Sequence, residues 1–276
     1  MADGLKLNLK EAIALKNAEG TWWELKGKDN SGASFSWQSP IAFTVDTSLG
    51  TSVELDRLNK SSGTTCTVDW GDGTVETATQ GLVHTYASSS STYDVKVTGD
   101  GPFWLVVSSY DNVTKVKGYY GNRTDNMSGI RSTALTYIAK LPKTITVMGA
   151  AFGLKSVNHS FIADIDTSNI VDMRFAFASN STFNQDLSGW NISKVTTMAN
   201  MLDDTAMSPE NYSRTLIGWA NQHYAGNAQD DVPLTAYTIT YNNTAYTTGN
   251  QFNDGVSARA YLVGTAGWTI SDGGQV

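Results

Sequence analysis

The chain has 276 residues, a net charge of −7 and only 16% charged residues. This low charge content, with Thr, Ser, Asn and Gly dominating the polar residues and aromatics throughout, favours strands and turns and does not resemble a disordered chain. The acidic balance, with a pI of about 4.9, argues against nucleic-acid binding and against docking on anionic lipid. No apolar run approaches the roughly 20 residues of a membrane span, so no membrane insertion is expected.

Residues 1–38 are predicted to form a distinct N-terminal docking segment. Leucines at positions 5, 7 and 9 alternate with polar residues, which indicates a strand, whereas Asn8 and Glu11 have the spacing of a helix-capping box. These two predictions compete. The segment is either an extra sheet edge on the next domain or an arm that docks on a partner.

Residues 39–110 are predicted to form a β-sandwich, because short alternating strands recur between turn signals. Cys66, the only cysteine, alternates with Val68 and Trp70 and is therefore expected to be a buried structural thiol. The expected strands are Ile41–Val45, Val53–Leu58, Thr65–Trp70, Val83–Tyr86, Tyr93–Thr98 and Phe103–Ser108.

Residues 111–207 contain an internal repeat. Met148, Met173 and Met198 are separated by 25 residues in each step (173 − 148 and 198 − 173), and neighbouring apolar positions keep the same period. A period of about 20–29 residues is typical of leucine-rich-type solenoids, in which each turn contributes one strand and buries its apolar face against its neighbours. Val113–Val116 is interpreted as a degenerate earlier turn.

Residues 208–276 are predicted to cap the last repeat, as the ends of solenoids require. Apolar residues at helical spacing predict a helix over Asn211–Gln222, with its start at Ser208-Pro209-Glu210. A second helix is expected over Val256–Val263, and a final strand over Ala266–Ile270.

Two stretches resemble known families. The sequence Val68–Thr74 (VDWGDGT), followed by His84-Thr85-Tyr86 and Tyr93–Val97, resembles the polycystic-kidney-disease-type (PKD) immunoglobulin-like domain. The stretch Phe183–Met198, with Leu216–Ala220 and Gly267–Gly274, resembles the BspA-type leucine-rich-repeat family of bacterial surface proteins. The resemblance implies adhesion at a surface. Since the first residues lack the basic start and apolar run of a signal peptide, the combination also fits a phage virion protein.

No catalytic residues are predicted, and the chain is not expected to be an enzyme. The three histidines, His84, His159 and His223, share no metal-ligand spacing, and no G-x-S-x-G motif occurs. Glycosidases use a pair of carboxylates, and five aspartates of the repeat region are candidates for such a pair. Aspartates in repeat turns are instead expected to accept backbone N–H bonds. The carboxylates considered are Asp164, Asp166, Asp186, Asp203 and Asp204.

Two kinds of binding site are candidates. Calcium is the best candidate for a cofactor, because Asp69, Asp72 and Asp111 could cluster at one end of the sandwich; the alternative is that Asp72 only stabilises its turn. Exposed aromatic residues could stack on a glycan or contact a protein partner, although most large aromatics pack in cores. The aromatic candidates are Trp22, Trp23, Trp37, Tyr119 and Tyr120.

Together these features predict a mainly β fold: an immunoglobulin-like sandwich, a short leucine-rich-repeat-type solenoid and a partly helical C-terminal cap. The predicted function is that of a phage virion structural protein, either a capsid decoration or a tail-associated protein. It is expected to be a homo-oligomer that docks on other virion proteins through residues 1–38 and faces a host glycan or protein. The alternatives are a BspA-type adhesin on a bacterial cell surface and a carbohydrate-binding module.

Overall fold

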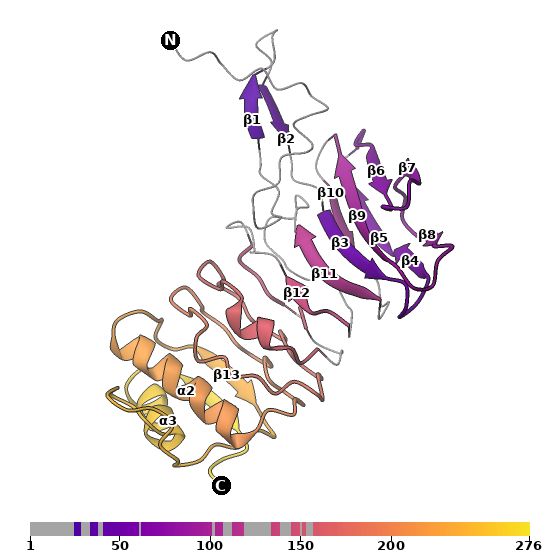
Figure 1. Ribbon diagram of the computed structural model, residues 1–276. Helices are drawn as coiled ribbons and strands as arrows, with labels where there is room; N and C mark the ends of the chain where they lie inside the picture. Colours follow the sequence, from indigo (N-terminus) through magenta and orange to yellow (C-terminus); the bar gives the residue numbers. More distant parts are fainter. Residues whose placement is uncertain are drawn as a thin grey trace, which may run out of the picture.

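A computed structural model describes residues 25–28, 34–37, 41–60, 62–100, 103–106, 112–118, 134–138, 145–149, 151–152 and 157–276. In these residues the chain is mainly β, with two α-helices that both lie in the last third of the sequence (Figure 1). The predicted mainly β fold class is therefore confirmed. No helix within the described ranges is long and apolar enough to span a membrane.

The largest sheet has six strands, and β3 and β9 lie at its centre (Figure 1). Its strands pair antiparallel, except for β11 and β12. Phe43, Val45, Val95 and Val97 are buried on these central strands, as the alternation of their sequences predicts. In sheet order the strands are β12 (Tyr137–Ile138), β11 (Val113–Gly118), β3 (Ile41–Asp46), β9 (Thr92–Gly99), β6 (Cys66–Asp69) and β7 (Val75–Thr77).

Three smaller antiparallel sheets have two strands each. They are β1 (Leu25–Lys28) with β2 (Ser34–Trp37), β4 (Ser52–Leu55) with β8 (Leu82–Thr85), and β5 (Arg57–Lys60) with β10 (Phe103–Val106). The prediction of one strand over Val53–Leu58 is wrong, because β4 and β5 are separate and pair with different partners. Leu55 and Leu58 are both buried. Since a spacing of three places side chains on opposite faces of one strand, the chain breaks at Asp56 to bury both.

These strands enclose a first hydrophobic cluster that runs from Ile41 to Val113. Phe43 and Trp70 are among its largest fully buried side chains. Cys66 is a free, buried cysteine, as predicted, and burial raises the pKa of its thiol.

Strand β11 connects two kinds of pairing. It lies antiparallel to β3 on one side and parallel to β12 on the other, with Lys115 opposite Tyr137. The interpretation of Val113–Val116 as a degenerate repeat turn is therefore incomplete, because Val113 packs in the first cluster. Only the parallel side of β11 has the pairing expected between repeats.

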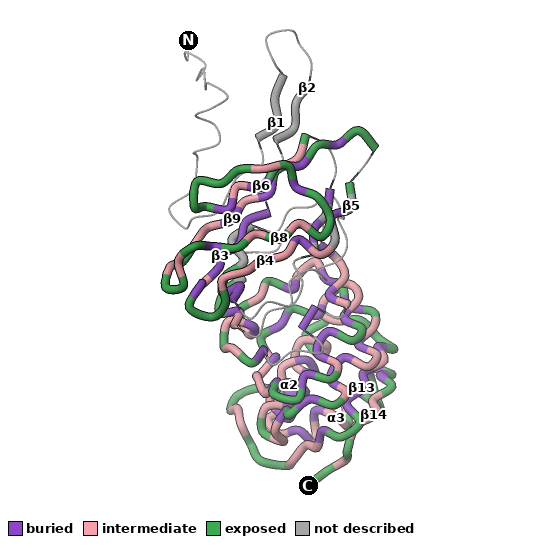
Figure 2. Tube along the Cα trace, turned by 90° about the vertical axis from the view of Figure 1, so that its right-hand side faces the viewer, coloured by how far each residue is buried: buried purple, intermediate pink, exposed green. Residues whose placement is uncertain are grey.

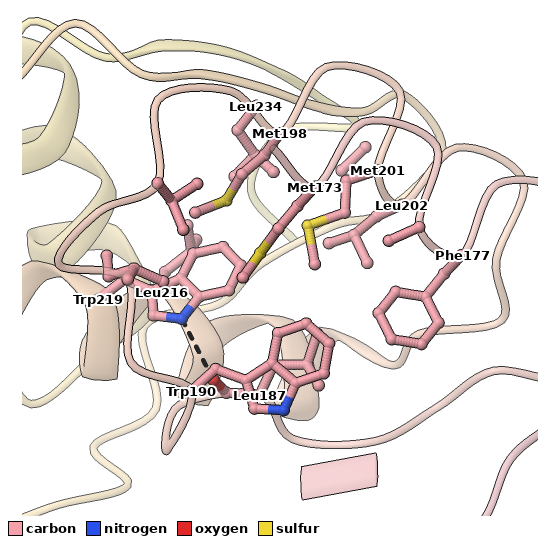
Figure 3. Packing of buried hydrophobic residues seen from close by; sticks show 14 of the residues in the cluster. Met173, Phe177, Leu187, Trp190, Met198, Met201, Leu202, Leu216, Trp219 and Leu234 are labelled. Carbon is pink, nitrogen blue, oxygen red and sulfur yellow. Dashed lines mark hydrogen bonds between the residues drawn. The ribbon is translucent and has the colours of Figure 1, made fainter. Parts of the chain in front are cut away.

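The 25-residue repeat corresponds to a parallel ladder. Isolated bridges join Val147 to Asp172 and Asp172 to Thr197. The amides of Met148, Met173 and Met198 each donate to a carbonyl of the following turn, at 2.8, 3.0 and 2.8 Å. All three methionines are buried, and Figure 3 shows Met173, Met198 and Leu234 in succession.

The prediction of one strand in each turn is wrong, because the ladder contains single bridges at these positions. The backbone bends at matching places in successive turns. Phe175 and Asn200 have φ of 60° and 56°, and Ser179 and Asp204 also have 60° and 56°. A left-handed residue cannot continue an extended strand, so each turn is bridged and then bends.

The C-terminal part covers the end of this ladder. Helix α2 (Pro209–Tyr224) is capped by Ser208, whose side chain accepts the Asn211 N–H, and α3 (Gly255–Gly264) is capped by Asp254, whose side chain accepts the Ser257 N–H. Both predicted helices are confirmed. The ladder continues through β13 (Pro233–Ala236), parallel to β14 (Thr269–Asp272). The predicted last strand begins three residues too early, because Gly267 has φ of 72° and turns the chain first.

A second hydrophobic cluster runs from Ile145 to Trp268 and joins the repeats to both helices. Figure 2 shows buried residues along the inside of this part and exposed residues on its outer turns. Helix α2 approaches the repeat closely at Gly218, where a Cβ would lie 2.4 Å from the Ser188 carbonyl oxygen. Glycine is therefore required at this contact. A five-residue 3-10 helix, η1 (Ser160–Asp164), lies between two repeats.

Candidate binding surface

The Trp-Gly-Asp-Gly turn uses its carboxylates to hold its own backbone. Asp69 Oδ1 accepts the Gly71 N–H at 2.9 Å, and Asp72 Oδ1 accepts the Thr74 N–H at 2.9 Å. Gly71 has φ of 83°, and a Cβ there would lie 2.6 Å from the Asp94 carbonyl oxygen. The turn therefore needs glycine at this position and Asx-type bonds on both sides of it.

His84 connects this turn to the aromatic core of the first cluster. Its Nε2 lies 2.9 Å from Asp72 Oδ2, and its ring stacks on Trp70 with the centroids 4.7 Å apart. The Trp70 indole donates to Glu76 Oε1 at 2.8 Å, and the Tyr86 hydroxyl donates to the Trp70 carbonyl at 3.0 Å. The residues that carry the PKD-like resemblance are thus joined in one hydrogen-bonded network across strands β6 and β8.

The predicted calcium site is only partly described. Asp69 and Asp72 lie in the same turn, but Asp111 lies outside the described residues. Within the described part of the chain, no three His, Cys, Asp or Glu residues are grouped to hold a metal ion. Because Asp69 and Asp72 already accept N–H bonds, the geometry favours the turn-stabilising role. The calcium site stays a prediction.

Two of the repeat carboxylates behave as expected. Asp166 and Asp186 accept the backbone N–H two residues later, at 3.1 Å from Ser168 and 2.8 Å from Ser188. Such bonds fix the conformation of the turn and engage one of the two oxygens of each carboxylate. Their predicted capping role is confirmed.

The other carboxylates take different positions. Asp203 has its pKa raised, first by burial and also by the neighbouring Asp204, while a bond from the Tyr237 N–H opposes this. Asp204 takes the left-handed conformation described above, and Asp164 ends η1.

Asparagine side chains form a ladder along the repeats. Asn158 Oδ1 accepts the Asn184 N–H at 2.8 Å, and Asn184 Oδ1 accepts the Ser208 N–H at 2.8 Å. The Asn211 amide also donates to Asn184 Oδ1 at 2.8 Å. Turn is therefore joined to turn by side chains as well as by backbone bonds.

The predicted aromatic binding residues cannot be compared with the structure. Trp22, Trp23, Tyr119 and Tyr120 lie outside the described residues. Trp37 ends β2, and only its backbone, paired with Leu25, is described. Their binding role stays a prediction.

An aromatic patch on the cap was missed by the sequence analysis. We define the cap patch as His223, Tyr224, Asp230, Phe252 and Tyr261. His223 holds it together: its Nδ1 lies 3.0 Å from the Tyr261 hydroxyl and its Nε2 lies 2.8 Å from Asp230 Oδ1. The Tyr224 ring meets Phe252 and Tyr261 edge-on, with centroids 6.0 and 6.1 Å apart.

The patch is open to solvent. Tyr224 is 58% exposed, and the Asp230 side chain is 74% exposed. The signal in the sequence was the helical phase of Tyr224. It lies five residues after the buried Trp219, off the stripe that packs inward.

The order Asp230, His223, Tyr261 has the connectivity of a carboxylate–base–nucleophile relay. Burial, followed by the charges of Tyr224 and Asp230, raises the pKa of the Tyr261 hydroxyl. A nucleophile requires the opposite change. The arrangement therefore fits binding better than covalent catalysis.

The comparisons with known proteins concern the repeats and α2. Residues 139–225 match a family model described as "Mycoplasma protein of unknown function, DUF285". This segment is similar to that family. It includes Met148, Met173 and Met198 as well as His223 and Tyr224 of the cap patch, and it is less than half of the chain. No curated protein and no solved structure matches the chain.

Proposed function

We propose that this chain is a non-enzymatic virion structural protein, a capsid decoration or tail-associated protein of a phage, that displays a surface for attachment. In this proposal the strands around the first cluster form an immunoglobulin-like sandwich, and the turns of the 25-residue repeat form a short leucine-rich-repeat-type solenoid. Helices α2 and α3 cap the last turn. Residues 1–38 dock on other virion proteins, and the chain assembles as a homo-oligomer.

The display role is supported by one observation: polar side chains of the repeats form hydrogen bonds within and between the turns. Asn158, Asn184 and Asn211 form the asparagine ladder, and Asp166 and Asp186 hold turns. Their hydrogen bonds hold the turns in place and join successive turns, as a rigid scaffold requires. The acidic, low-charge composition fits solubility and dense display on a surface.

The setting is tested on purified particles. Mass spectrometry of virions from a producing culture, after density-gradient purification, should detect this chain at a fixed copy number relative to the major capsid protein. A gold-labelled antibody raised against residues 41–113 should then label the outside of the particle. Particles that are complete without the chain would contradict the virion setting.

A second candidate is a BspA-type adhesin on a bacterial cell surface. The match of residues 139–225 to a family described as a Mycoplasma protein supports it, because Mycoplasma is a cellular organism. Protease treatment of intact cells distinguishes the two proposals. Loss of the chain from the cell surface supports the adhesin, whereas its presence only in released particles supports the virion protein.

A further inference from the structure

We infer that the cap patch is a binding site for neutral hexose-containing glycans. This inference rests on the proposed attachment function and names what one part of the displayed surface binds. The site lies where the end of α2 meets α3 and the loop before it (Figure 1).

The aromatic rings of the cap patch contact one another. Tyr224 meets Phe252 at an interplanar angle of 88° and Tyr261 at 68°, both in edge contact. Phe252 and Tyr261 also contact each other, with centroids 4.5 Å apart. Rings that touch in this way leave no space for a cation between them, which separates the patch from an aromatic cage. They support the Tyr224 ring as a platform.

A carboxylate gives the cap patch a polar rim. A sugar ring presents C–H bonds on one face, which stack on an aromatic ring, and hydroxyls around its edge, which need hydrogen-bond partners. Asp230, which is linked to the platform through His223 and Tyr261, supplies such a partner, since its Oδ1 is engaged by His223 while the side chain is 74% exposed. Ligand sites typically combine a large apolar contact with a few fixed polar groups in this way.

The residues of the cap patch are ordered by their own hydrogen bonds. His223 is bonded on both ring nitrogens, to Tyr261 and to Asp230, and its ring lies edge-on to Tyr261 with centroids 5.6 Å apart. The carboxylate and the aromatic rings are therefore held relative to each other before a ligand arrives. A site that is already ordered loses less conformational freedom when it binds.

Charge selects the class of glycan. Asp230 is a carboxylate at the rim, and the whole chain has a net charge of −7. Like charges repel at an exposed site, so acidic glycans such as hyaluronan should be rejected. Neutral glycans are not opposed in this way.

Isothermal titration calorimetry of the full chain tests the inference, with cellohexaose, maltohexaose, the hexamer of N-acetylglucosamine and a hyaluronan hexasaccharide as probes. At least one neutral probe should bind with a dissociation constant below the millimolar range, and hyaluronan should not bind. Tyr224→Ala should weaken that binding by about tenfold, because the stacking platform is removed. Tyr224→Phe should retain most of it.

Tyr237→Ala is the matched control. Tyr237 is a similarly exposed tyrosine, at 63%, that follows β13 and makes no ring contact within the described residues. This variant should bind as the unchanged chain does, and both alanine variants should keep the same unfolding midpoint. The inference is overturned if no neutral probe binds, if hyaluronan binds equally well, or if Tyr224→Ala binds normally. Because the assay uses isolated protein, these outcomes do not depend on whether the chain is found in virions.

Discussion

The indole Nε1 of Trp190 donates a hydrogen bond of 2.8 Å to the backbone carbonyl of Ile162, which lies one turn earlier in the chain. Trp219 does the same to Leu187 at 3.2 Å (Figure 3), and Trp268 to Gln229 at 2.9 Å. The Ile162 carbonyl also accepts the Ile165 N–H at 3.3 Å, and the Leu187 carbonyl also accepts the Trp190 N–H at 3.0 Å. The indoles therefore give these two carbonyls a second donor and fill the core at the same time.

Trp190→Phe should therefore lower the free energy of unfolding by about 0.5–1.5 kcal/mol, because the Ile162 carbonyl loses the indole donor and keeps only its bond from the Ile165 N–H, at 3.3 Å. Trp190→Ala should cost more, about 3–5 kcal/mol, since it also leaves a cavity. Urea unfolding followed by tryptophan fluorescence and circular dichroism measures both. Tyr237→Phe, at an exposed position, is the control and should change stability by less than about 0.5 kcal/mol. Equal stability of Trp190→Phe and the unchanged chain would show that the indole hydrogen bond makes no net contribution to the free energy of unfolding.

The turn at Asp72 should make the first cluster sensitive to acid. Burial alone would raise the pKa of Asp72, but hydrogen bonds from Thr74 and His84 outweigh it and hold the pKa below its ordinary value. A carboxyl whose pKa is lowered on folding contributes stability above its unfolded pKa, near 4, and loses it as the pH falls through the folded pKa. Asp72→Asn should therefore be less stable at pH 7 and should lose less stability between about pH 4 and pH 2.

Stability of both forms is measured by urea unfolding at a series of pH values. Asp230→Asn is the control, because Asp230 is highly exposed and should leave the acid dependence nearly unchanged. Parallel pH profiles for Asp72→Asn and the unchanged chain would contradict the prediction.

The ion pair between Arg259 and Asp272 should be costly to break. Arg259 Nε lies 2.7 Å from Asp272 Oδ2, and the Asp272 side chain is 1% exposed. The Tyr212 hydroxyl donates to the same oxygen at 3.1 Å. Arg259→Met leaves a buried carboxylate without its cation and should cost about 3 kcal/mol or more.

The double variant Arg259→Met with Asp272→Leu should recover much of that loss, because neither charge is then buried alone. Glu210→Gln is the exposed comparison, since Glu210 and Arg214 form an i,i+4 pair on the surface of α2 that is worth only a few tenths of a kcal/mol. Thermal unfolding of all three variants gives the comparison. A single variant as stable as the double would rule out the unpaired charge as the cause.

Phe175 is an exposed aromatic in a strained conformation. Its φ is 60° and it is 47% exposed, whereas Asn200 takes the same conformation one repeat later. Asparagine tolerates the left-handed region better than phenylalanine does. Phe175→Asn should therefore raise the free energy of unfolding by about 0.5–1 kcal/mol.

Phe175→Ala separates strain from packing, because alanine keeps the conformational penalty but removes the ring. Differential scanning calorimetry should rank the asparagine variant above both the unchanged chain and the alanine variant. A destabilised asparagine variant would mean that the Phe175 ring contributes packing that outweighs the strain.

The sequence predicted those elements whose periodicity is local. The helices around Trp219 and Leu262, the alternating strand at Val95 and Val97, and the capping by Asp166 and Asp186 all follow from spacing and turn chemistry. The 25-residue step of the methionines likewise predicted which positions would align in successive turns. These features need no knowledge of distant residues.

The predictions from sequence were wrong or incomplete where contacts between residues far apart in the chain determine the local structure. The break at Asp56 depends on β4 and β5 pairing with different strands, and the bend at Phe175 contradicts the ordinary preference of an aromatic residue. The cap patch was missed because it joins residues from both helices and two loops, and His223 had no neighbour of interest within its own stretch of sequence. Such groupings exist only after the chain has folded.

Strand β11 has a sheet neighbour on both sides, one antiparallel and one parallel. The main-chain bonds of β11 therefore join β12 directly to the sheet of the first cluster. A pulling force along β11 would load its bonds to β3 and to β12 together in shear, so that several bonds would have to break at once before β11 could slide past its two neighbours.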